Sequence, residues 1–558
     1  MTETPSPLEP ISSDLDALFP TLTPAQLQRV AARGRARSIV SGEVLIEAGE
    51  QSARIVLVQE GQVELVQLSG SGETLVALVS PGQFTGEVSI FSGRRSLVRV
   101  RARAAGEVVE IEREPLMALI QTDGELGEIF MRAFILRRLE LTAQGLGDVV
   151  LLGSSHSPGT LRIKEFLTRA NQPYSYVDLD REAGVQELLD HFHVAFEDVP
   201  VVICRSEIVL RNPSNEQIAE CLGFNAAVDQ TRLRDVVVVG AGPAGLAAAV
   251  YAASEGLDVL VLEMDAPGGQ AGSSSKIENY LGFPMGVSGQ ELANSAIMQA
   301  QKFGAQMMLA KSARALTCDR LPYAVEIDES VRIPARSIVI AAGAHYRKLP
   351  VDGLSRFEGS GVYYAATFVE AQWCNGEEVI VVGGGNSAGQ AALFLAESAA
   401  RVHLLVRSDG LENSMSRYLI RRIEESPSIA LRTHTEITSA EGDDHLQRVS
   451  WRDSKAQTSE TQPIRHVFVM TGAIPNTQWL DGCLALDENG FIKTGPALSH
   501  DDLVAGHWPL TRTPYLLETS LPSVFAVGDV RAGNQKRVAS AVGEGSTAVA
   551  FVHQVLQE

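Results

Sequence analysis

Two glycine clusters in the C-terminal part of the chain have the residue types and the spacing of dinucleotide-binding turns. Each follows a short run of valines and isoleucines that predicts a buried strand, and each opens an alanine-rich stretch that predicts a helix. In such a turn the glycines permit a tight bend and a close approach of backbone to a pyrophosphate, which the helix N-terminus receives. The predicted contact residues are Gly240, Gly242, Pro243, Ala244 and Gly245 in the first turn and Gly383, Gly385, Asn386, Ser387 and Ala388 in the second. Together they predict two dinucleotide sites, one for a flavin and one for a nicotinamide.

The residues at the ends of the second strands distinguish the two sites. Glu263 follows the first turn by about 20 residues, where an acid accepts hydrogen bonds from a ribose diol. Arg407 ends the matching strand after the second turn, where a base pairs with a 2′-phosphate, so NADP fits better than NAD. A solvent-exposed arginine at a strand end is the alternative interpretation of Arg407.

The segments around these turns resemble the low-molecular-weight thioredoxin reductases over about residues 232–558. The resemblance implies FAD and NADPH as cofactors, with the flavin ring, ribityl chain and neighbouring groups held by further residues. These are Gly268, Gly269, Gln270, Asn279, Gly343, Gly528, Asp529, Arg537, Val538 and Ala539. Ser408 and Glu412 replace further basic residues of the family, which predicts a weaker preference for NADPH than the family has.

One departure from that family concerns its Cys-x-x-Cys pair, which the flavin reduces. Ala365 and Phe368 stand at those positions, and neither side chain can form a thiolate or exchange with a disulfide. Cys374 lies nearby but is single, and a buried small residue is the favoured interpretation over a redox partner. The resemblance therefore implies fold and cofactors without dithiol catalysis, and we assign no catalytic residue and no metal ligand.

Residues 147–225 resemble a glutaredoxin domain that has lost its thiols. Ser157 and Thr160 occupy the positions of the family's Cys-Pro-x-Cys motif, and Val199-Pro200 matches its cis-proline turn. A serine hydroxyl is no thiol-exchange nucleophile at neutral pH, and Cys204 and Cys221 are expected in the core. The resemblance favours a docking or regulatory platform over a redox site.

The N-terminal 146 residues contain short β-type segments separated by glycine turns, which predicts a barrel or jelly roll. Residues 81–96 resemble the phosphate cassette of cyclic-nucleotide-binding domains, and the residues implied in contact with a nucleotide are Gly86, Glu87, Arg95 and Ser96. Bulky Leu97 stands where small residues usually line the pocket, so a barrel used only for assembly is the alternative. Arg99 and Arg101 predict a solvated strand face or an anion-binding surface. A helix is expected over residues 125–144, of a kind that pairs subunits in that family.

Composition limits the class of protein. With 558 residues the chain supports several domains, and a formal net charge of −21 argues against nucleic acid as a partner. No apolar run reaches about 18 residues and the first ten residues are unlike a signal peptide, so no membrane association is expected. Five scattered cysteines predict no disulfide framework and hence a reducing, cytoplasmic location.

We therefore predict an α/β multidomain protein with two Rossmann-like domains, a thioredoxin-like α/β domain and an N-terminal β-barrel or jelly-roll domain. The expected boundaries are 1–146 (cyclic-nucleotide-binding-like), 147–225 (glutaredoxin-like), 232–350 and 480–558 (two parts of the FAD domain) and 351–479 (NAD(P)H domain). The expected function is NADPH-dependent flavoprotein reductase acting on an unidentified acceptor, with a cyclic nucleotide and a redox protein as candidate partners and a homodimer as assembly. The alternatives are a thioredoxin-reductase-like ferredoxin or flavodoxin–NADP reductase and a non-catalytic flavin redox sensor.

Overall fold

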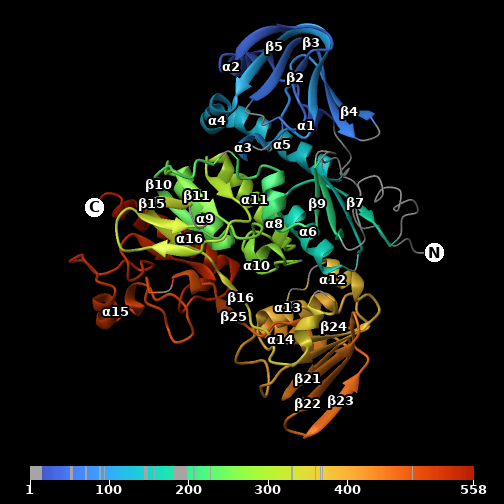
Figure 1. The fold of residues 1–558 in the computed structure, drawn as a ribbon, viewed down its shortest axis with the longest axis vertical. Coiled ribbons are helices and arrows are strands. Elements are labelled where there is room, and N and C mark those ends of the chain that lie inside the picture. Colours follow the sequence, from blue (N-terminus) through green and yellow to red (C-terminus); the bar gives the residue numbers. More distant parts are fainter. Residues whose placement is uncertain are drawn as a thin grey trace.

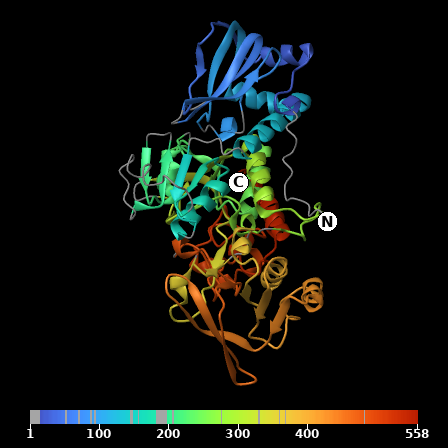
Figure 2. The ribbon, with the colours of Figure 1, turned by 90° about the vertical axis from the view of Figure 1, so that its right-hand side faces the viewer.

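The computed structural model places four sheet-containing parts along one long axis. The N-terminal antiparallel sheet lies at one end, the sheet with the second glycine turn lies at the other, and the remaining parts lie between them (Figures 1 and 2). The structure describes residues 15–50, 54–69, 72–86, 89–92, 95–143, 149–155, 157–180, 198–204, 208–226, 228–274, 276–327, 331–358, 360–364, 366, 368–480 and 482–558.

The N-terminal part is a five-stranded antiparallel sheet followed by helices. Its strands run in the order β1-β5-β3-β4, and β2 pairs with β5. The strands are β1 (Arg35–Ile39), β2 (Val44–Ile46), β3 (Arg54–Ser69), β4 (Gly72–Val79) and β5 (Arg99–Glu112). The helices are α1 (Leu15–Leu18), α2 (Pro24–Ala31), α3 (Ser89–Ser92), α4 (Arg113–Thr122) and α5 (Gly124–Ala143). The helix predicted over 125–144 is thus confirmed as α5, but its apolar residues Leu126, Phe130 and Phe134 are buried within this part of the chain rather than left for a partner.

The arginine face of β5 is neutralised by acids. Arg99 pairs with Glu47 and Glu73 at 2.7 and 2.6 Å, and Arg101 pairs with Glu64 and Glu73 at 2.6 and 2.9 Å. These pairs satisfy the guanidinium groups within the sheet, so the face is not the anion-binding surface that the sequence left open.

The second part is a four-stranded mixed sheet in the order β7-β6-β8-β9, with β6 and β7 parallel and the other pairs antiparallel. Its elements are β6 (Val149–Gly153), α6 (Pro158–Arg169), β7 (Ser175–Asp178), β8 (Val201–Cys204), β9 (Ile208–Arg211) and α8 (Asn215–Cys221). The Val199–Pro200 peptide bond is cis, as predicted. A Cβ on Gly159, at the start of α6, would lie 3.0 Å from the Pro200 ring, so the turn that begins α6 rests on this proline.

The third part is a seven-stranded sheet built from two distant stretches of the chain. Its order is β12-β11-β10-β15-β14-β13, and β26 from the last forty residues pairs in parallel with β15. The strands are β10 (Arg234–Val239), β11 (Val259–Leu262), β12 (Gln306–Met308), β13 (Ala315–Thr317), β14 (Tyr323–Glu326), β15 (Arg332–Ile340) and β26 (Val524–Ala526). The helices are α9 (Pro243–Ser254), α10 (Gly269–Gly272), α11 (Gly289–Lys302), α15 (His500–Ala505) and α16 (Val538–Val555). Alanines and valines of α9 and α16 form one buried cluster with the valines of β10 and β11, which fixes the helices on the sheet.

The fourth part carries a parallel five-stranded sheet in the order β17-β24-β18-β19-β20 and a three-stranded antiparallel sheet. The parallel strands are β17 (Val362–Tyr363), β18 (Glu378–Val382), β19 (Arg401–Leu405), β20 (Ile429–Arg432) and β24 (His466–Val469). The antiparallel strands are β21 (Thr435–Gly442), β22 (Leu446–Asp453) and β23 (Thr458–Gln462), and the helices are α12 (Phe368–Trp373), α13 (Asn386–Leu395) and α14 (Arg417–Glu425). The chain enters and leaves this part through β16 (Ala344–Tyr346) and β25 (Ala473–Pro475), which pair antiparallel and form its connection to the third part.

A disulfide joins the two stretches of the third part. Cys318 follows β13 and Cys483 lies 165 residues later in the sequence, with their Cα atoms 6.0 Å apart. The scattered cysteines were expected to form no disulfide framework, and the single bridge arises because the returning chain brings two distant residues together. Cys204 and Cys374 are buried as expected, whereas Cys221 is only half-buried.

The described residues contain neither a membrane-spanning helix nor a cluster of metal ligands. None of their helices is long and apolar enough to cross a membrane. No group of three or more histidine, cysteine or acidic side chains among them could hold a metal ion.

Candidate functional site

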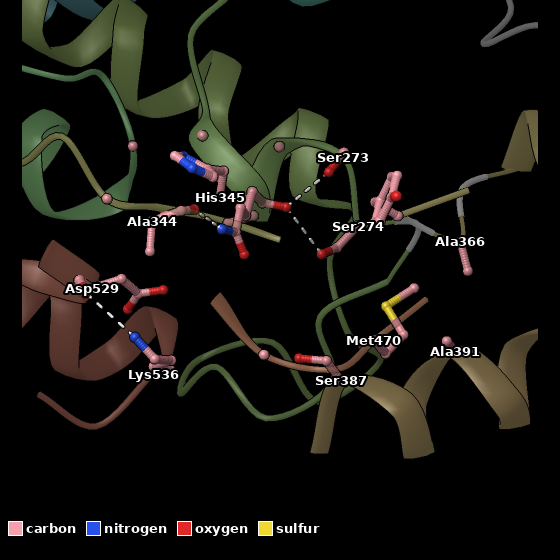
Figure 3. A pocket seen from close by; sticks show the side chains of 18 of the residues that line it. Ser273, Ser274, Ala344, His345, Ala366, Ser387, Ala391, Met470, Asp529 and Lys536 are labelled. Carbon is pink, nitrogen blue, oxygen red and sulfur yellow. Dashed lines mark hydrogen bonds between the residues drawn. The ribbon is translucent and has the colours of Figure 1, made fainter. Parts of the chain in front are cut away.

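A cavity of about 2420 Å³ lies where the third and fourth parts meet, and both glycine turns line it. Figure 3 shows side chains of this cavity, with Asp529 and Lys536 from one side and Ser387, Ala391 and Met470 from the other. The predicted cofactor residues that line it are Gly240, Gly242, Pro243, Ala244, Glu263, Gly269, Gln270, Asn279, Gly343, Gly383, Gly385, Asn386, Ser387, Arg407, Gly528, Asp529, Arg537 and Val538. The structure thus brings together residues almost 300 positions apart.

The first glycine turn has no room for side chains. Gly240 has φ +103°, and a Cβ there would lie 2.4 Å from the carbonyl oxygen of Ala341. A Cβ on Gly245 would lie 1.9 Å from the carbonyl oxygen of Gly240, so this glycine packs helix against strand instead of lining the cavity. The bare backbone between them, with Gly242 as the N-cap of α9, is a concave surface at a helix N-terminus that suits a pyrophosphate.

Glu263 is held rigidly beside this turn. Its carboxylate accepts hydrogen bonds from the backbone N–H of Ala241 at 2.7 Å and of Asp265 at 3.0 Å. Its side chain is only 7% exposed, and burial raises the pKa of this carboxyl above its ordinary value, against the lowering effect of these hydrogen bonds and of Arg169. Each oxygen retains acceptor capacity toward the cavity, as a ribose diol requires.

A second turn, residues 266–269, closes the same wall. The N–H of Gly268, which has φ +100°, donates to the carbonyl of Ala241 at 2.8 Å. Gln270 donates from Nε2 to the carbonyl of Ala344 (Figure 3). Gly268 itself lies outside the cavity lining and serves the turn's conformation.

Asp529 supplies the acid on the opposite wall. Figure 3 shows its side chain beside that of Lys536, whose Nζ donates to the Asp529 backbone carbonyl at 3.3 Å. Burial raises the pKa of the Asp529 carboxyl above its ordinary value. Arg537 is the N-cap of α16 and lines the cavity with Val538, whereas Ala539 does not.

These features fit FAD. The glycine turn that a Cβ would fill would hold the pyrophosphate, the buried Glu263 the adenosine ribose and the half-buried Asp529 the polyhydroxy chain, and all three line one cavity.

The second glycine turn repeats the backbone geometry at the other end of the cavity. Gly383 has φ +142°, and a Cβ there would lie 2.3 Å from the Met470 carbonyl oxygen. Gly385 is the N-cap of α13, Asn386 accepts from the N–H of Ser416 at 2.7 Å, and Ala388 is fully buried behind the turn. Arg407 lines the cavity and is exposed, with no hydrogen bond or ion pair to any residue that the structure describes.

Sequence reasoning missed the contact that joins β16 to β25 beside the cavity. The His345 ring contacts the Asn476 side chain, and Asn476 also donates to the Ala342 carbonyl at 2.8 Å. His345 lies two residues after Gly343, which is a predicted cofactor-contact residue. This position in the sequence was the signal that could have identified His345.

Three of the four positions where the two resembled families carry redox cysteines lie among the described residues. Ala365 lies outside the described residues, and Phe368 is the first residue of α12, next to cavity-lining Ala366. Ser157 is the N-cap of α6, and Thr160 in its first turn is fully buried. No two of the chain's five cysteines are three positions apart, so neither place can hold a Cys-x-x-Cys dithiol.

Three of the four predicted nucleotide residues of the N-terminal part lie among the described residues, and each contacts another residue of the chain. The Gly86 carbonyl accepts from Arg137 at 2.7 Å, and the Ser96 hydroxyl donates to the Val98 carbonyl at 2.7 Å. Arg95 lies against Gly223 of the second part, where a Cβ would be 3.0 Å from its Nε. Glu87 lies outside the described residues. Arg95 therefore contacts the second part of the chain, and its contact with a cyclic phosphate stays a prediction.

Comparison with known families agrees with this geometry. The model of the pyridine nucleotide-disulphide oxidoreductase family matches residues 234–545, and that of the cyclic nucleotide-binding domain matches residues 36–123. The chain is 33% identical over 316 residues to a thioredoxin reductase of Mycolicibacterium smegmatis, covering 57% of this chain and 94% of the relative. It is 29% identical over 331 residues to that of Bacillus subtilis, covering 59% and 97%.

Solved structures give the same result. A crystal structure of Lactococcus lactis thioredoxin reductase matches 58% of this chain and 100% of its own, with 28% identity and a TM-score of 0.51. That of T. acidophilum covers 59% and 100%, with 28% identity and a TM-score of 0.52. The chain belongs to the pyridine nucleotide-disulphide oxidoreductase family, and it carries a cyclic nucleotide-binding domain in addition. The prediction of an FAD- and NADPH-dependent oxidoreductase of the thioredoxin reductase type is confirmed at the level of the family.

Proposed function

We propose that this protein transfers reducing equivalents from NADPH through FAD to an acceptor outside the chain, without a dithiol of its own. The observation that carries this proposal is the single cavity lined by both glycine turns in a chain that has no Cys-x-x-Cys pair. FAD bound in this cavity would supply the redox chemistry: NADPH would be oxidised to NADP⁺, and its electron pair would reduce one two-electron acceptor or two one-electron acceptors.

The residues of the chain divide this work by position. The first glycine turn, Glu263 and Asp529 hold the FAD, and the second glycine turn and Arg407 hold the NADPH. A relative supports the choice of co-substrate: an NADPH-dependent thioredoxin reductase of Arabidopsis thaliana is 30% identical to this chain over 331 residues.

The test is an anaerobic titration of the purified yellow protein with NADPH, followed by a panel of acceptors. Quinone, oxygen, an iron–sulfur protein, flavodoxin and thioredoxin form the panel. Bleaching within a catalytic time and reoxidation by an acceptor support an enzyme, and selective reoxidation by ferredoxin or flavodoxin supports that reductase class. Bleaching without turnover on any acceptor favours a flavin redox sensor.

Two sets of cysteine substitutions test the dithiol-independent route. One variant is Cys204→Ser/Cys221→Ser/Cys374→Ser, and the other is Cys318→Ser/Cys483→Ser. With the acceptor that reoxidises the wild-type protein, each variant should turn over at the wild-type rate. Robust thioredoxin-linked turnover that one of these variants loses would place a redox pair among these cysteines and contradict the proposal.

We also propose that the cyclic nucleotide-binding domain regulates the flavin site. Its helix α4 contacts α11, where Gln121 donates to the Lys302 carbonyl at 3.0 Å and Met298 packs on the domain's core. Helix α11 follows the cavity-lining segment that contains Asn279. Cyclic AMP and cyclic GMP should change the rate of flavin reduction by NADPH, and an unchanged rate with both would reject this role.

The thioredoxin-like domain, the homodimer and the cytoplasmic location belong to the same proposal. The mixed sheet order and the contact of Gly159 with cis-Pro200 support the first. Light scattering tests the assembly, and cell fractionation tests the location.

A further inference from the structure

The second part of the chain, which has Ser157 and Thr160 in place of a cysteine pair, is fixed against the flavin side of the cavity. Asn215 donates to Asp265 at 2.5 Å, and Lys311 pairs with Glu216 at 2.5 Å. Asn225 exchanges two hydrogen bonds with the backbone of Leu309, at 2.9 and 3.0 Å. Leu309, Ala310 and Ala266 share one buried cluster with the apolar residues of α6. The two parts therefore form a packed and hydrogen-bonded interface.

Arg169, at the C-terminal end of α6, makes the most directed contact of this interface. Its Nη2 donates to the carbonyls of Ala266 at 2.8 Å and Gly269 at 3.1 Å, and its Nε donates to the carbonyl of Pro267 at 3.2 Å. Its Nη1 pairs with Glu165 at 3.0 Å, and the side chain is 12% exposed. One guanidinium thus ties together three carbonyls of a single turn, residues 266–269.

That turn is part of the cofactor cradle. A Cβ on Gly269 would lie 2.9 Å from the Cα of Gly242, so the 266–269 turn and the first glycine turn touch through bare backbone. The Gly268 N–H donates to the Ala241 carbonyl, and Ala241 in turn donates to Glu263. A shift of the 266–269 turn would therefore displace the groups that face the pyrophosphate and the ribose.

The carbonyls of this turn need a fixed cationic donor. Gly268 and Gly269 both have positive φ, and the carbonyl oxygens of residues 266, 267 and 269 converge on the guanidinium of Arg169. A planar guanidinium offers five donors in a rigid fork, whereas a lysine ammonium offers a point charge on a flexible stem. Arginine is thus the side chain that fits this position.

We propose that Arg169 is a positioning residue for FAD, and that the second part of the chain serves to brace the flavin cradle through helix α6. The domain then keeps the scaffold of a redox module but contributes a structural contact, not electrons. This proposal rests on the FAD site of the proposed function.

The test measures binding of FAD to the apoprotein by quenching of flavin fluorescence, alongside thermal unfolding of the apoprotein. Losing charge-assisted hydrogen bonds of this kind predicts a Kd for FAD raised about 10- to 100-fold in Arg169→Ala. Arg169→Lys, which keeps the charge and can still fold if alanine fails, should raise it about 3- to 10-fold.

Asn225→Ala is the matched control, because Asn225 belongs to the same interface but contacts Leu309 and not the 266–269 turn. It should lower the unfolding temperature of the apoprotein while leaving the Kd for FAD within about twofold. A Kd unchanged in Arg169→Ala, or raised equally in Asn225→Ala, would overturn the positioning role. Failure of the wild-type protein to bind FAD would instead overturn the proposed function.

Discussion

The two dinucleotide cradles share a backbone plan but differ in how firmly the chain holds their polar groups. In the flavin cradle Glu263 is 7% exposed and is fixed by two backbone N–H groups, and the neighbouring turn is tied by Arg169 from another domain. In the nicotinamide cradle Arg407 is exposed and has no partner among the described residues. A preorganised cradle suits a resident cofactor, whereas an unpartnered charge that is free to meet its ligand suits a co-substrate that binds and leaves at every turnover.

The glycine turns offer the largest effect and the sharpest test of this contrast. At Gly240 and Gly383 an alanine must adopt a positive φ and collide with a carbonyl oxygen at 2.4 and 2.3 Å. We expect Gly240→Ala to weaken FAD binding more than about 100-fold and to give nearly colourless protein. Gly383→Ala should stay yellow but no longer bleach with NADPH at concentrations that saturate the wild type.

Gly256→Ala provides the control for these variants, since Gly256 has φ +89° but a Cβ there meets nothing within 4 Å. It should lose about 1 kcal/mol of stability and keep both activities. A yellow Gly240→Ala protein, or a colourless Gly383→Ala protein, would break the division into a resident and an exchanging site.

The Cys318–Cys483 disulfide should stabilise the flavin part more than any cysteine stabilises the nicotinamide part. It closes a stretch of 165 residues that contains the whole nicotinamide part. Removing it with Cys318→Ser/Cys483→Ser should cost about 2–5 kcal/mol of unfolding free energy. Chemical denaturation with and without dithiothreitol measures this, and reduction should destabilise the wild type but not the double variant. Cys374→Ser is the control. If dithiothreitol does not shift the denaturation transition of the wild-type protein, the prediction is contradicted.

Arg407 tests the exchanging site directly. Loss of one charge-assisted phosphate contact, about 1.5–3 kcal/mol, should raise the KM for NADPH about 10- to 100-fold in Arg407→Ala and leave the KM for NADH unchanged. Arg401→Ala, at the exposed start of the same strand, should change neither constant. Equal losses for NADPH and NADH would show that Arg407 does not recognise the 2′-phosphate.

What the sequence predicted well was local. Both glycine turns, Glu263 and Arg407 follow from strand and helix periods within single βαβ units, so short stretches suffice to place them. The contacts of Arg169 with Gly269, of His345 with Asn476 and of Cys318 with Cys483 join residues 100, 131 and 165 positions apart. Each depends on how distant stretches of the chain pack together, and no residue spacing within one motif encodes that packing.

Asp529 gives the smallest effect, and its sign separates binding from stability. Burial raises the pKa of its carboxyl in the folded protein above the ordinary value of 3.8. Well below that value the carboxyl is protonated in both the folded and unfolded states and contributes nothing; as the pH rises through the folded pKa, the folded state must bury a charge and loses stability. At neutral pH the Asp529→Asn apoprotein should therefore unfold about 1–3 °C higher than the wild type, and this gain should vanish in acid.

The same Asp529→Asn variant should bind FAD more weakly, because an acceptor for hydroxyl groups is lost. Thermal unfolding of apoprotein and holoprotein across pH measures both effects, and an apoprotein that Asp529→Asn destabilises at neutral pH would show that the carboxylate is satisfied by the chain itself and is not reserved for the cofactor.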